Sequence, residues 1–275
     1  MFTRGIEVKT PGQLKKMRQA GLVVARTLTA LREHVVAGVT TGELDAIARE
    51  LLAEAGATSS FLGYGARWGT PFPAVTCIST NDEIVHGIPG ERVLADGDLV
   101  SVDFGAILDG WHGDAARTFT VGQVSPEHAE LSRVTEEAMW AGIGAARLGG
   151  RIGDIGAAIE ASIVAAGSYG IVREYTGHGI GSQMHMEPDV PNWGRKGRGA
   201  KIVEGMALAI EPMATLGTED TVELDDEWTV VTADESWASH WENTITVTRQ
   251  GLWVLTLEDG GEAELTARGL PFGPL

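Results

Sequence analysis

The stretch LVSVDFGAILDGWHGDAARTFTV, residues 99–121, places Asp109-Gly110 between two runs of strand-forming residues. An Asp-Gly pair in this setting is a strong signal for a two-residue hairpin turn, because such turns need positive φ at both central residues. If these two residues form the turn, Leu108 faces Trp111 and the register of the whole hairpin follows. The sequence therefore predicts an antiparallel pair of strands across this stretch.

That register places two carboxylates on one face of the hairpin. Asp103 lies opposite Ala116 and Asp114 lies opposite Gly105. As diagonal neighbours, the aspartates have Cβ atoms up to roughly 7–8 Å apart. Buried side by side without a cation, two carboxylates would repel and one would have to protonate. We therefore expect them to converge on a shared cation, with His112 on the same face as a weaker third candidate.

Two helix pairs of similar sequence lie before and after the hairpin. Apolar residues at helical spacing predict one helix that begins at Pro11 and a second that ends at Gly56, and another pair between Pro126 and Gly167. A constant offset of 111 residues indicates an internal duplication, because it matches Gly38 with Gly149, Gly42 with Gly153, Glu43 with Asp154, Leu44 with Ile155, Ala46 with Ala157, Ala55 with Ala166 and Gly56 with Gly167.

Duplicated helix pairs combined with antiparallel strands predict an α+β fold with pseudo-twofold symmetry. A duplicated fold often places its site between the halves, where both can supply ligands. Since no linker or low-complexity tract interrupts the chain, residues 1–275 are predicted to form a single catalytic domain. The expected strands lie within residues 74–79, 98–108, 115–121, 206–212, 221–232 and 242–258.

Composition excludes several classes of protein. A formal net charge of −17 argues against nucleic-acid binding, which draws on clustered Lys and Arg. Cys77 is the sole cysteine in the sequence, so an internal disulfide and a multi-cysteine zinc site are both excluded. The N-terminus has no apolar signal segment, and no stretch approaches the ~20 apolar residues of a membrane span. We therefore expect a soluble, cytoplasmic protein.

The glycine-rich stretch GHGIGSQMHMEP, residues 177–188, contains two histidines. On a helix, His178 and His185 would lie roughly 10 Å apart along the axis, too far for one ion. On a straight strand they would point to opposite faces. We expect a loop or strand end that directs one imidazole to a metal and the other to a substrate. The alternative is a glycine-rich loop with two ordinary polar histidines.

Two glutamates lie at the ends of strand-like runs. Glu211 ends the apolar run in MALAIEPM and is held extended by Pro212, whereas Glu242 opens the last alternating run. Either glutamate alone is typical of a solvated strand end. Together with the two aspartates and His178, they form an oxygen-rich set suited to two adjacent divalent ions such as Mn, Fe, Co or Zn.

In combination, these motifs resemble those of type I methionine aminopeptidases, a family with the pita-bread fold. The resemblance covers nearly the whole chain, and the duplication agrees independently with the family's pseudo-symmetric halves. The chain has neither a Cys/His-rich N-terminal extension nor a long insertion between His178 and Glu211, so we expect the minimal bacterial type. The segments that carry the resemblance are IEVKTPGQLKKMRQAG, NDEIVHGIPG, LVSVDFGAILDGWHGDAARTF, GHGIGSQMHMEP, MALAIEPM and SHWENTITVT.

The resemblance implies a two-metal site. In the family pattern Asp103 chelates one ion, His178 and Glu211 hold the other, and Asp114 and Glu242 bridge. The implied reaction is the removal of the initiator methionine when a small residue follows it. A metal-activated water would attack the scissile carbonyl.

The resemblance also implies three catalytic side chains. Glu211 would move the proton as well as hold a metal. His86, in NDEIVHGIPG, would contact the scissile amide or the substrate amine, and His185 would contact the scissile carbonyl and stabilise its developing charge. The implied partners are peptides and nascent chains, with transient ribosome contact and a monomeric state as further expectations.

An apolar methionine pocket with aromatic walls and sulfur is implied as well. Two segments depart from the family pattern. Residues 64–72 belong to a segment that is longer than usual, which affects Phe61 also, and GDAARTF lacks the hydroxyl residues that commonly follow Asp114. The expected pocket residues are Tyr64, Phe72, Cys77, Met184 and Trp228.

Three other interpretations share the fold. Xaa-Pro aminopeptidases and dipeptidases use the same ligand set, but they usually have an extra N-terminal domain, and here only about 100 residues precede Asp103. A metal-free binding protein typically loses ligands, and a creatinase-like hydrolase should lack the carboxylate set. All five ligand positions are filled in this sequence, so we favour the aminopeptidase.

Overall fold

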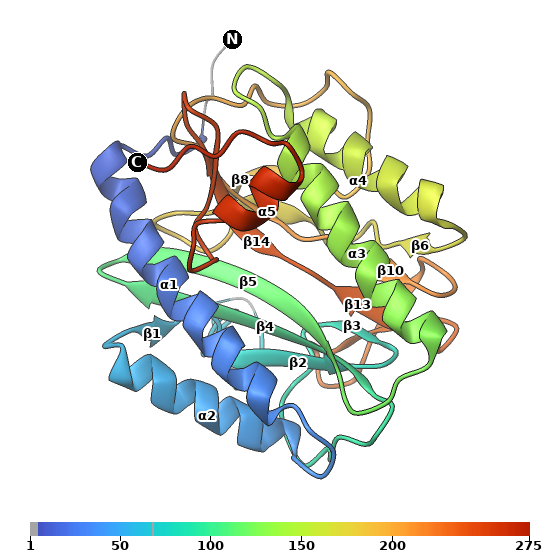
Figure 1. Ribbon diagram of the computed structural model, residues 1–275. Helices are drawn as coiled ribbons and strands as arrows, with labels where there is room; N and C mark the ends of the chain where they lie inside the picture. Colours follow the sequence, from blue (N-terminus) through green and yellow to red (C-terminus); the bar gives the residue numbers. More distant parts are fainter. Residues whose placement is uncertain (1–4, 68) are drawn as a thin grey trace.

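The computed structural model describes residues 5–67 and 69–275 and has the predicted α+β architecture (Figure 1). All of the predicted helices are present, with one more near the C-terminus. No helix in the described part of the chain is long and apolar enough to cross a membrane. The helices are α1 (Pro11–His34), α2 (Thr41–Glu54), α3 (Pro126–Ala145), α4 (Ile152–Ala166) and α5 (Glu262–Ala267).

The predicted hairpin is confirmed. It consists of β4 (Leu99–Leu108) and β5 (Trp111–Thr120), paired antiparallel along their full lengths in the expected register. Asp109 and Gly110 form the turn with φ of 50° and 78°. Because a two-residue turn with both φ values positive matches the twist of the strands, this pair fixes which residues face each other.

Two larger sheets contain or flank the five predicted metal ligands. In the first, β4 pairs with β5 on one edge and with β1 (Thr58–Ser59) and β2 (Thr76–Thr80) on the other. The second has the order β15-β14-β9-β7-β8, with the bounds β7 (Gly177–Gly179), β8 (Met186–Val190), β9 (Ala207–Ile210), β14 (Asn243–Val247) and β15 (Leu252–Val254).

Smaller sheets complete the fold. The predicted strand at residues 221–232 is in fact two short strands joined by a turn, β11 and β12, which pair antiparallel. The smaller sheets have the orders β13-β10-β6 and β11-β12-β3, with the bounds β3 (Glu83–Val85), β6 (Gly170–Ile171), β10 (Met213–Thr215), β11 (Thr221–Glu223), β12 (Val230–Thr232) and β13 (Ala238–His240).

The duplication is visible in equivalent contacts at the starts of α2 and α4. The amide of Gly42 donates to the carbonyl of Gly90, and the amide of Gly153 donates to that of Arg198, both at 2.9 Å. A Cβ at Gly42 would lie 3.0 Å from the Gly90 oxygen, and one at Gly153 would lie 2.9 Å from the Arg198 oxygen. Glycine is therefore favoured at both positions, because a loop passes directly over each helix start.

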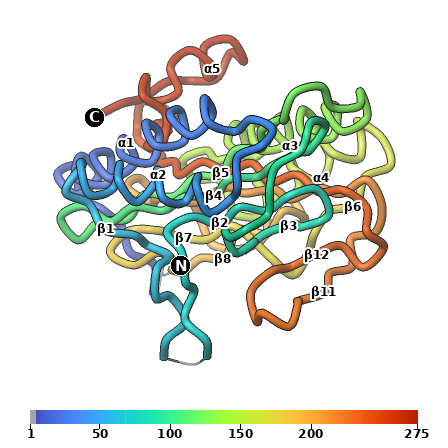
Figure 2. Tube along the Cα trace, turned by 90° about the horizontal axis from the view of Figure 1, so that it is seen from below, coloured from blue at the N-terminus to red at the C-terminus, as the bar shows by residue number. Residues whose placement is uncertain are grey.

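The helices cover one side of the sheets. The apolar positions predicted for α1 are all buried, from Leu14 to Leu31. This helix approaches β5 closely, because a Cβ at Gly113 would lie 2.7 Å from the Gly21 amide nitrogen. Figure 2 shows α1, α2 and α3 on one side of the sheets, with residues 61–67 and 69–72 and the β11–β12 hairpin projecting on the other.

The hairpin turn offers a direct test of the fold. Gly110→Ala should lower the free energy of unfolding by about 1–2 kcal/mol, because alanine is disfavoured at φ 78° although the space around it is open. Equilibrium unfolding in urea measures this change. Gly12→Ala, at an equally open position in the first turn of α1, is the matched control and should be neutral or slightly stabilising. Equal effects of the two substitutions would contradict the assigned turn.

Candidate active site

One cavity gathers every residue that the sequence analysis assigned to the site, except the weaker candidate His112. It opens between the two large sheets, so both halves of the duplication contribute to it. Phe61 and Val85 line it as well. The predicted residues that line it are Tyr64, Phe72, Cys77, His86, Asp103, Asp114, His178, Met184, His185, Glu211, Trp228 and Glu242.

Five of these side chains come from the central strands. The β4–β5 hairpin supplies Asp103 and Asp114 from one half. In the other half, Glu211 directly follows β9 and Glu242 directly precedes β14, and these strands pair beside both residues. His178 is the middle residue of β7, the neighbour of β9. Strand pairing therefore brings residues from distant parts of the sequence to one point.

The carboxylates are buried together. Asp114, His178 and Glu242 each offer a ligand atom within 4.8 Å of the others. Oδ1 of Asp103, Oδ1 of Asp114 and Oε1 of Glu242 are buried, and no described residue makes a hydrogen bond with them. Orphaned buried oxygens of this kind need an external partner. A divalent cation fits the charge and the oxygen-rich donor set.

Burial disfavours the charged forms of these acids. It raises the pKa of Asp114 to about 7, and burial together with the neighbouring carboxylates raises the pKa of Asp103 and of Glu242 well above the usual range. The pKa of Glu211 is also raised well above its usual range, first by burial and then by Asp114. Without a cation the cluster therefore holds protons, which a metal would displace.

His178 presents a ring nitrogen that suits a cation. Its Nδ1 lies 3.0 Å from the carbonyl oxygen of Gly179, which can only accept, so Nδ1 carries the proton. Burial lowers the pKa of His178 to about 3, so the ring is neutral and Nε2 has a lone pair. Nε2 lies 3.3 Å from Oε1 of Glu211, also an acceptor when ionised. A metal ion between these two atoms turns a repulsive contact into a favourable one.

His112, the weaker ligand candidate, is not supported. It shares a face with Asp114, but it is absent from the described residues that line the cavity. Its Nδ1 lies 2.9 Å from the hydroxyl of Ser60, and its amide donates to the carbonyl of Gly181. The hairpin register places the His112 side chain on the expected face. The ring contacts the hydroxyl of Ser60 there and does not line the cavity.

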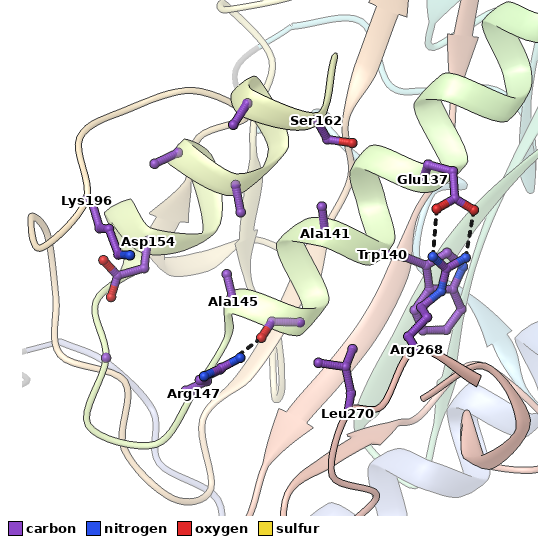
Figure 3. A pocket seen from close by; sticks show the side chains of 15 residues that line it. Glu137, Trp140, Ala141, Ala145, Arg147, Asp154, Ser162, Lys196, Arg268 and Leu270 are labelled. Carbon is purple, nitrogen blue, oxygen red and sulfur yellow. Dashed lines mark hydrogen bonds and ion pairs between the residues drawn. The ribbon is translucent and has the colours of Figure 1, made fainter. Parts of the chain in front are cut away.

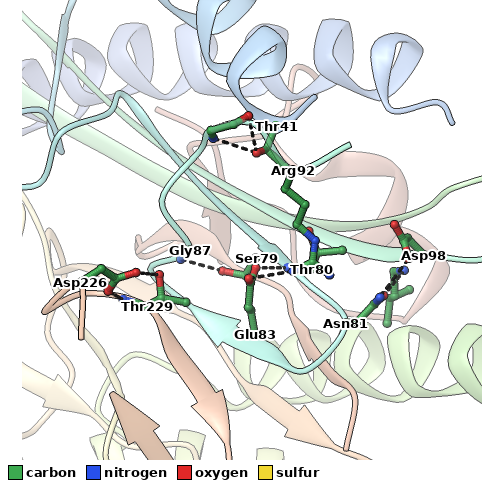
Figure 4. A network of polar contacts seen from close by, with 12 residues as sticks. Thr41, Ser79, Thr80, Asn81, Glu83, Gly87, Arg92, Asp98, Asp226 and Thr229 are labelled. Carbon is green, nitrogen blue, oxygen red and sulfur yellow. Dashed lines mark hydrogen bonds and ion pairs between the residues drawn. The ribbon is translucent and has the colours of Figure 1, made fainter. Parts of the chain in front are cut away.

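His86 is held by a network of polar contacts around its turn (Figure 4). It follows β3 with φ 60°, an uncommon conformation for a residue other than glycine. The amide of Gly87 donates to Oγ of Ser79 at 3.1 Å, and Glu83 accepts from the amide of Thr80 at 2.7 Å and from Arg92 at 2.8 Å. Burial lowers the pKa of His86 to about 4, so a neutral ring faces the cavity.

His185 lies beside His178 but has different partners. The ring centroids are 4.3 Å apart, at nearly a right angle. His185 is exposed, whereas His178 is buried. Nδ1 of His185 shares a hydrogen bond of 2.6 Å with the hydroxyl of Tyr64. The expectation that the two imidazoles are directed to different atoms of one site agrees with this geometry.

Aromatic rings and sulfur form another part of the cavity wall, where Cys77 lies next to Asp103 across paired strands. The ring of Phe72 lies 6.4 Å from that of Phe61 and 5.2 Å from that of Trp228, both edge-on. Cys77 and Met184 are buried among them, and burial raises the pKa of the Cys77 thiol well above its usual value, so it stays neutral. Such a surface suits an apolar, flexible side chain.

Contacts with Trp228 hold the unusually long segment. Nε1 of Trp228 donates to the carbonyl of Thr70 at 3.0 Å, and the amide of Phe72 donates to the carbonyl of Tyr64 at 2.8 Å. Asp226 in turn accepts from the amide of Trp228 at 2.9 Å. It also accepts from the amide and the hydroxyl of Thr229, just before β12, at 2.7 and 2.6 Å (Figure 4). The longer segment therefore still delivers Tyr64 and Phe72 to the cavity.

Two residues near the site were not predicted. His240 is buried, with Nε2 at 3.7 Å from Oε2 of Glu211. Arg117 is also behind the site, where its guanidinium donates to the main-chain carbonyl of Glu242 and, at 2.7 Å, to Oδ1 of Asn243. The position of His240, two residues before Glu242, could have indicated that it lies near the site. No local sequence pattern indicates this for Arg117.

The missing hydroxyls after Asp114 are only partly replaced. Oγ1 of Thr244 accepts from the amide of Asp114 at 3.2 Å and donates to its carbonyl at 2.8 Å. These contacts hold the main chain and leave the carboxylate free for other partners.

A larger hollow between α3 and α4 has a different character (Figure 3). Alanine and glycine residues of both helices line it, and no histidine does. At its edge Arg268 makes paired hydrogen bonds of 2.7 and 2.8 Å with Glu137. The two charged groups at this edge are therefore paired with each other.

Comparison with known proteins agrees with this geometry. Residues 15–249 match the model of metallopeptidase family M24. The chain belongs to this family. Divalent metal binding at the buried carboxylate and histidine cluster fits a metallopeptidase.

Individual relatives in family M24 are similar over most of the chain. Methionine aminopeptidase 1 of Mycobacterium tuberculosis is 51% identical over 260 residues, covering 92% of this chain and 96% of that protein. The crystal structure of methionine aminopeptidase from Rickettsia prowazekii has a TM-score of 0.88 and 40% identity, covering 92% of this chain and all of the other. Prolidase from Pyrococcus furiosus, at 22% identity and a TM-score of 0.70, shares the fold over 65% of its length. The predicted pita-bread fold is confirmed.

The buried acids predict how pH and metal affect stability. Because folding raises the pKa of Asp114 from its unfolded value near 4 to about 7, the stability of the metal-free protein should fall as pH rises through this interval. Added Mn²⁺ should restore it, because the ion binds the ionised carboxylates of the folded state. Thermal melts in chelator and in Mn²⁺ at pH 5 and pH 8 measure both effects.

Asp114→Asn should raise the melting temperature of the metal-free protein at pH 8 and remove most of the response to Mn²⁺. Asp225→Asn, at an exposed position in the β11–β12 turn, is the matched control and should leave both unchanged. An undiminished Mn²⁺ response in Asp114→Asn would contradict the assignment of the site.

Proposed function

We propose that this chain is a methionine aminopeptidase that removes the initiator methionine from peptides and nascent proteins with a small second residue. One observation carries the proposal. The aromatic and sulfur-lined wall and the buried carboxylate cluster belong to the same cavity, which His86 and His185 also line. A pocket for a methionine side chain therefore adjoins groups suited to hydrolysing the next peptide bond.

The proposed cofactors are two divalent ions, drawn from Co, Mn, Fe or Zn. Asp103 would hold one ion, His178 and Glu211 the other, and Asp114 and Glu242 both. The orphaned oxygens and the His178–Glu211 contact support this division. Such ions, when bound, supply Lewis acidity and a nucleophile near neutral pH.

The chain's own residues would bind the substrate and move the proton. The substrate's methionine lies against Phe72, Cys77 and Trp228 in this proposal, which excludes water from that side of the scissile bond. Glu211 takes the proton from the nucleophile and returns it to the leaving amine. His86 and His185 orient the substrate amide and stabilise the oxyanion. We also propose a monomeric, cytoplasmic enzyme with transient ribosome contact.

Peptide hydrolysis tests the function. Chelator-stripped protein should release the first residue from Met-Ala-Ser only after Mn²⁺ or Co²⁺ is added, and should leave Lys-Ala-Ser intact because an ammonium is disfavoured in the apolar pocket. Amino-acid release is measured by chromatography. Preference for Ala-Pro-Ala would instead support an Xaa-Pro enzyme, and no release with any metal would support a binding protein.

The proton-transfer role predicts a loss of turnover. Glu211→Gln should lower kcat on Met-Ala-Ser by at least about tenfold, the low end of what a general acid-base group supplies. Steady-state kinetics on folded protein measures this. Glu204→Gln, which changes an exposed carboxylate paired with Arg249, is the control and should keep wild-type turnover. Near wild-type activity of Glu211→Gln would remove Glu211 from this role.

A further inference from the structure

His240 is a buried imidazole that the proposed mechanism does not use. The side chain is almost completely inaccessible, with 1% of the residue exposed. Its Nε2 has no hydrogen-bond partner among the described residues. Oε2 of the Glu211 carboxylate lies 3.7 Å from this nitrogen. A fully buried ring nitrogen without a partner is uncommon and requires an explanation.

Hydroxyl groups hold the backbone of His240 in place. Its amide lies 3.1 Å from Oγ1 of Thr118 and 3.3 Å from Oγ of Ser101. Oγ1 of Thr118 also donates to the carbonyl of His240 at 2.8 Å. Thr118 and Ser101 are partners on the β4–β5 hairpin, on the same face as Asp103. The ring therefore has a fixed position relative to the carboxylate cluster.

Glu211 lies between two imidazoles that differ in what they offer. His178 presents a lone pair to Oε1, as its contact with Gly179 shows, and so cannot donate to it. Oε2 faces Nε2 of His240, which has no hydrogen-bond partner among the described residues. The gap of 3.7 Å exceeds a hydrogen bond by less than about 1 Å, which a small rotation of the Glu211 carboxylate can close.

We propose that His240 is a positioning residue, which donates a hydrogen bond from Nε2 to Oε2 of ionised Glu211 and thereby orients Oε1 toward the metal and the nucleophile. This inference rests on the proposed function of Glu211 in the same site. Partners that orient a ligand in this way typically affect metal affinity or activity by about 10–100-fold. His240 itself touches neither the substrate nor the nucleophile in this assignment.

Replacement of His240 tests the proposal in two ways. His240→Leu keeps an apolar side chain of substantial size but cannot donate, so Mn²⁺ affinity measured by calorimetry should fall about tenfold or more. On Met-Ala-Ser, kcat should fall about tenfold while KM changes less than about twofold, because the methionine pocket is intact. His240→Gln places an amide donor at a similar distance and should restore both quantities to within about threefold of wild type.

Controls separate positioning from packing. Ser239→Ala removes a buried hydroxyl next to His240 that contacts Thr118 and not Glu211, and it should keep wild-type Mn²⁺ affinity. If His240→Leu does not fold, as judged by circular dichroism, then His240→Asn provides a donor too short to reach and should show the same losses. Wild-type affinity and kcat in folded His240→Leu or His240→Asn, or an equal loss in Ser239→Ala, would overturn the proposal.

The calorimetric measurement distinguishes failure of the proposed aminopeptidase function from failure of the proposed role of His240. If wild-type protein binds Mn²⁺ but releases no methionine, the proposed function fails, whereas a tenfold affinity difference between His240→Leu and His240→Gln still supports the hydrogen bond to Glu211. If wild-type protein cleaves Met-Ala-Ser but the two variants behave alike, only the role of His240 fails.

Discussion

The register of the β4–β5 hairpin is the constraint on which the site depends. It places Asp103 and Asp114 on one face, and a slip of one residue would send one strand's side chains to the other side of the sheet. The same face carries Ser101 and Thr118, which hold the backbone of His240. The hairpin also holds the other half directly, because the amide of Glu242 donates to the carbonyl of Ala116 at 3.0 Å. One antiparallel pair thus positions ligands from both halves.

The buried carboxylates that form the site also destabilise the folded protein. Four carboxylates are buried together, and this burial raises the pKa of each of them. Arg117 provides a partial counterweight on the far side, where burial lowers its pKa to about 10 and it remains charged at neutral pH. The apolar clusters beneath α1–α2 and α3–α4 must therefore supply the stability that the buried carboxylates remove. A bound cation turns the same charges into a stabilising interaction.

The sequence predicted those features that depend on local pattern. The Asp-Gly turn determined the hairpin register, and helical spacing with glycine matches revealed the duplicated helix pairs. Features that depend on long-range pairing were not predicted. His240 is significant only because β13 pairs with β10, whose start lies two residues after Glu211. His112 was placed on the correct face, but its contact with Ser60 comes from a segment far away in sequence. The spacing of apolar residues and the residue types of a turn can be read from a short stretch of sequence, whereas the contact partner of a side chain is set by tertiary structure.

The adjacent histidines His178 and His185 show how one glycine-rich stretch serves two purposes. A Cβ at Gly177 would collide with the carbonyl of Ala209, so β7 lies close to β9 and His178 is drawn into the buried cluster. The chain then turns, and His185 emerges just before β8, where it is exposed and bonded to Tyr64. Burial and a main-chain acceptor keep His178 neutral with a lone pair available, as a metal ligand needs. Exposure and a phenolic partner leave His185 accessible to a substrate that enters the cavity. The difference between the two roles therefore arises from backbone packing around identical side chains.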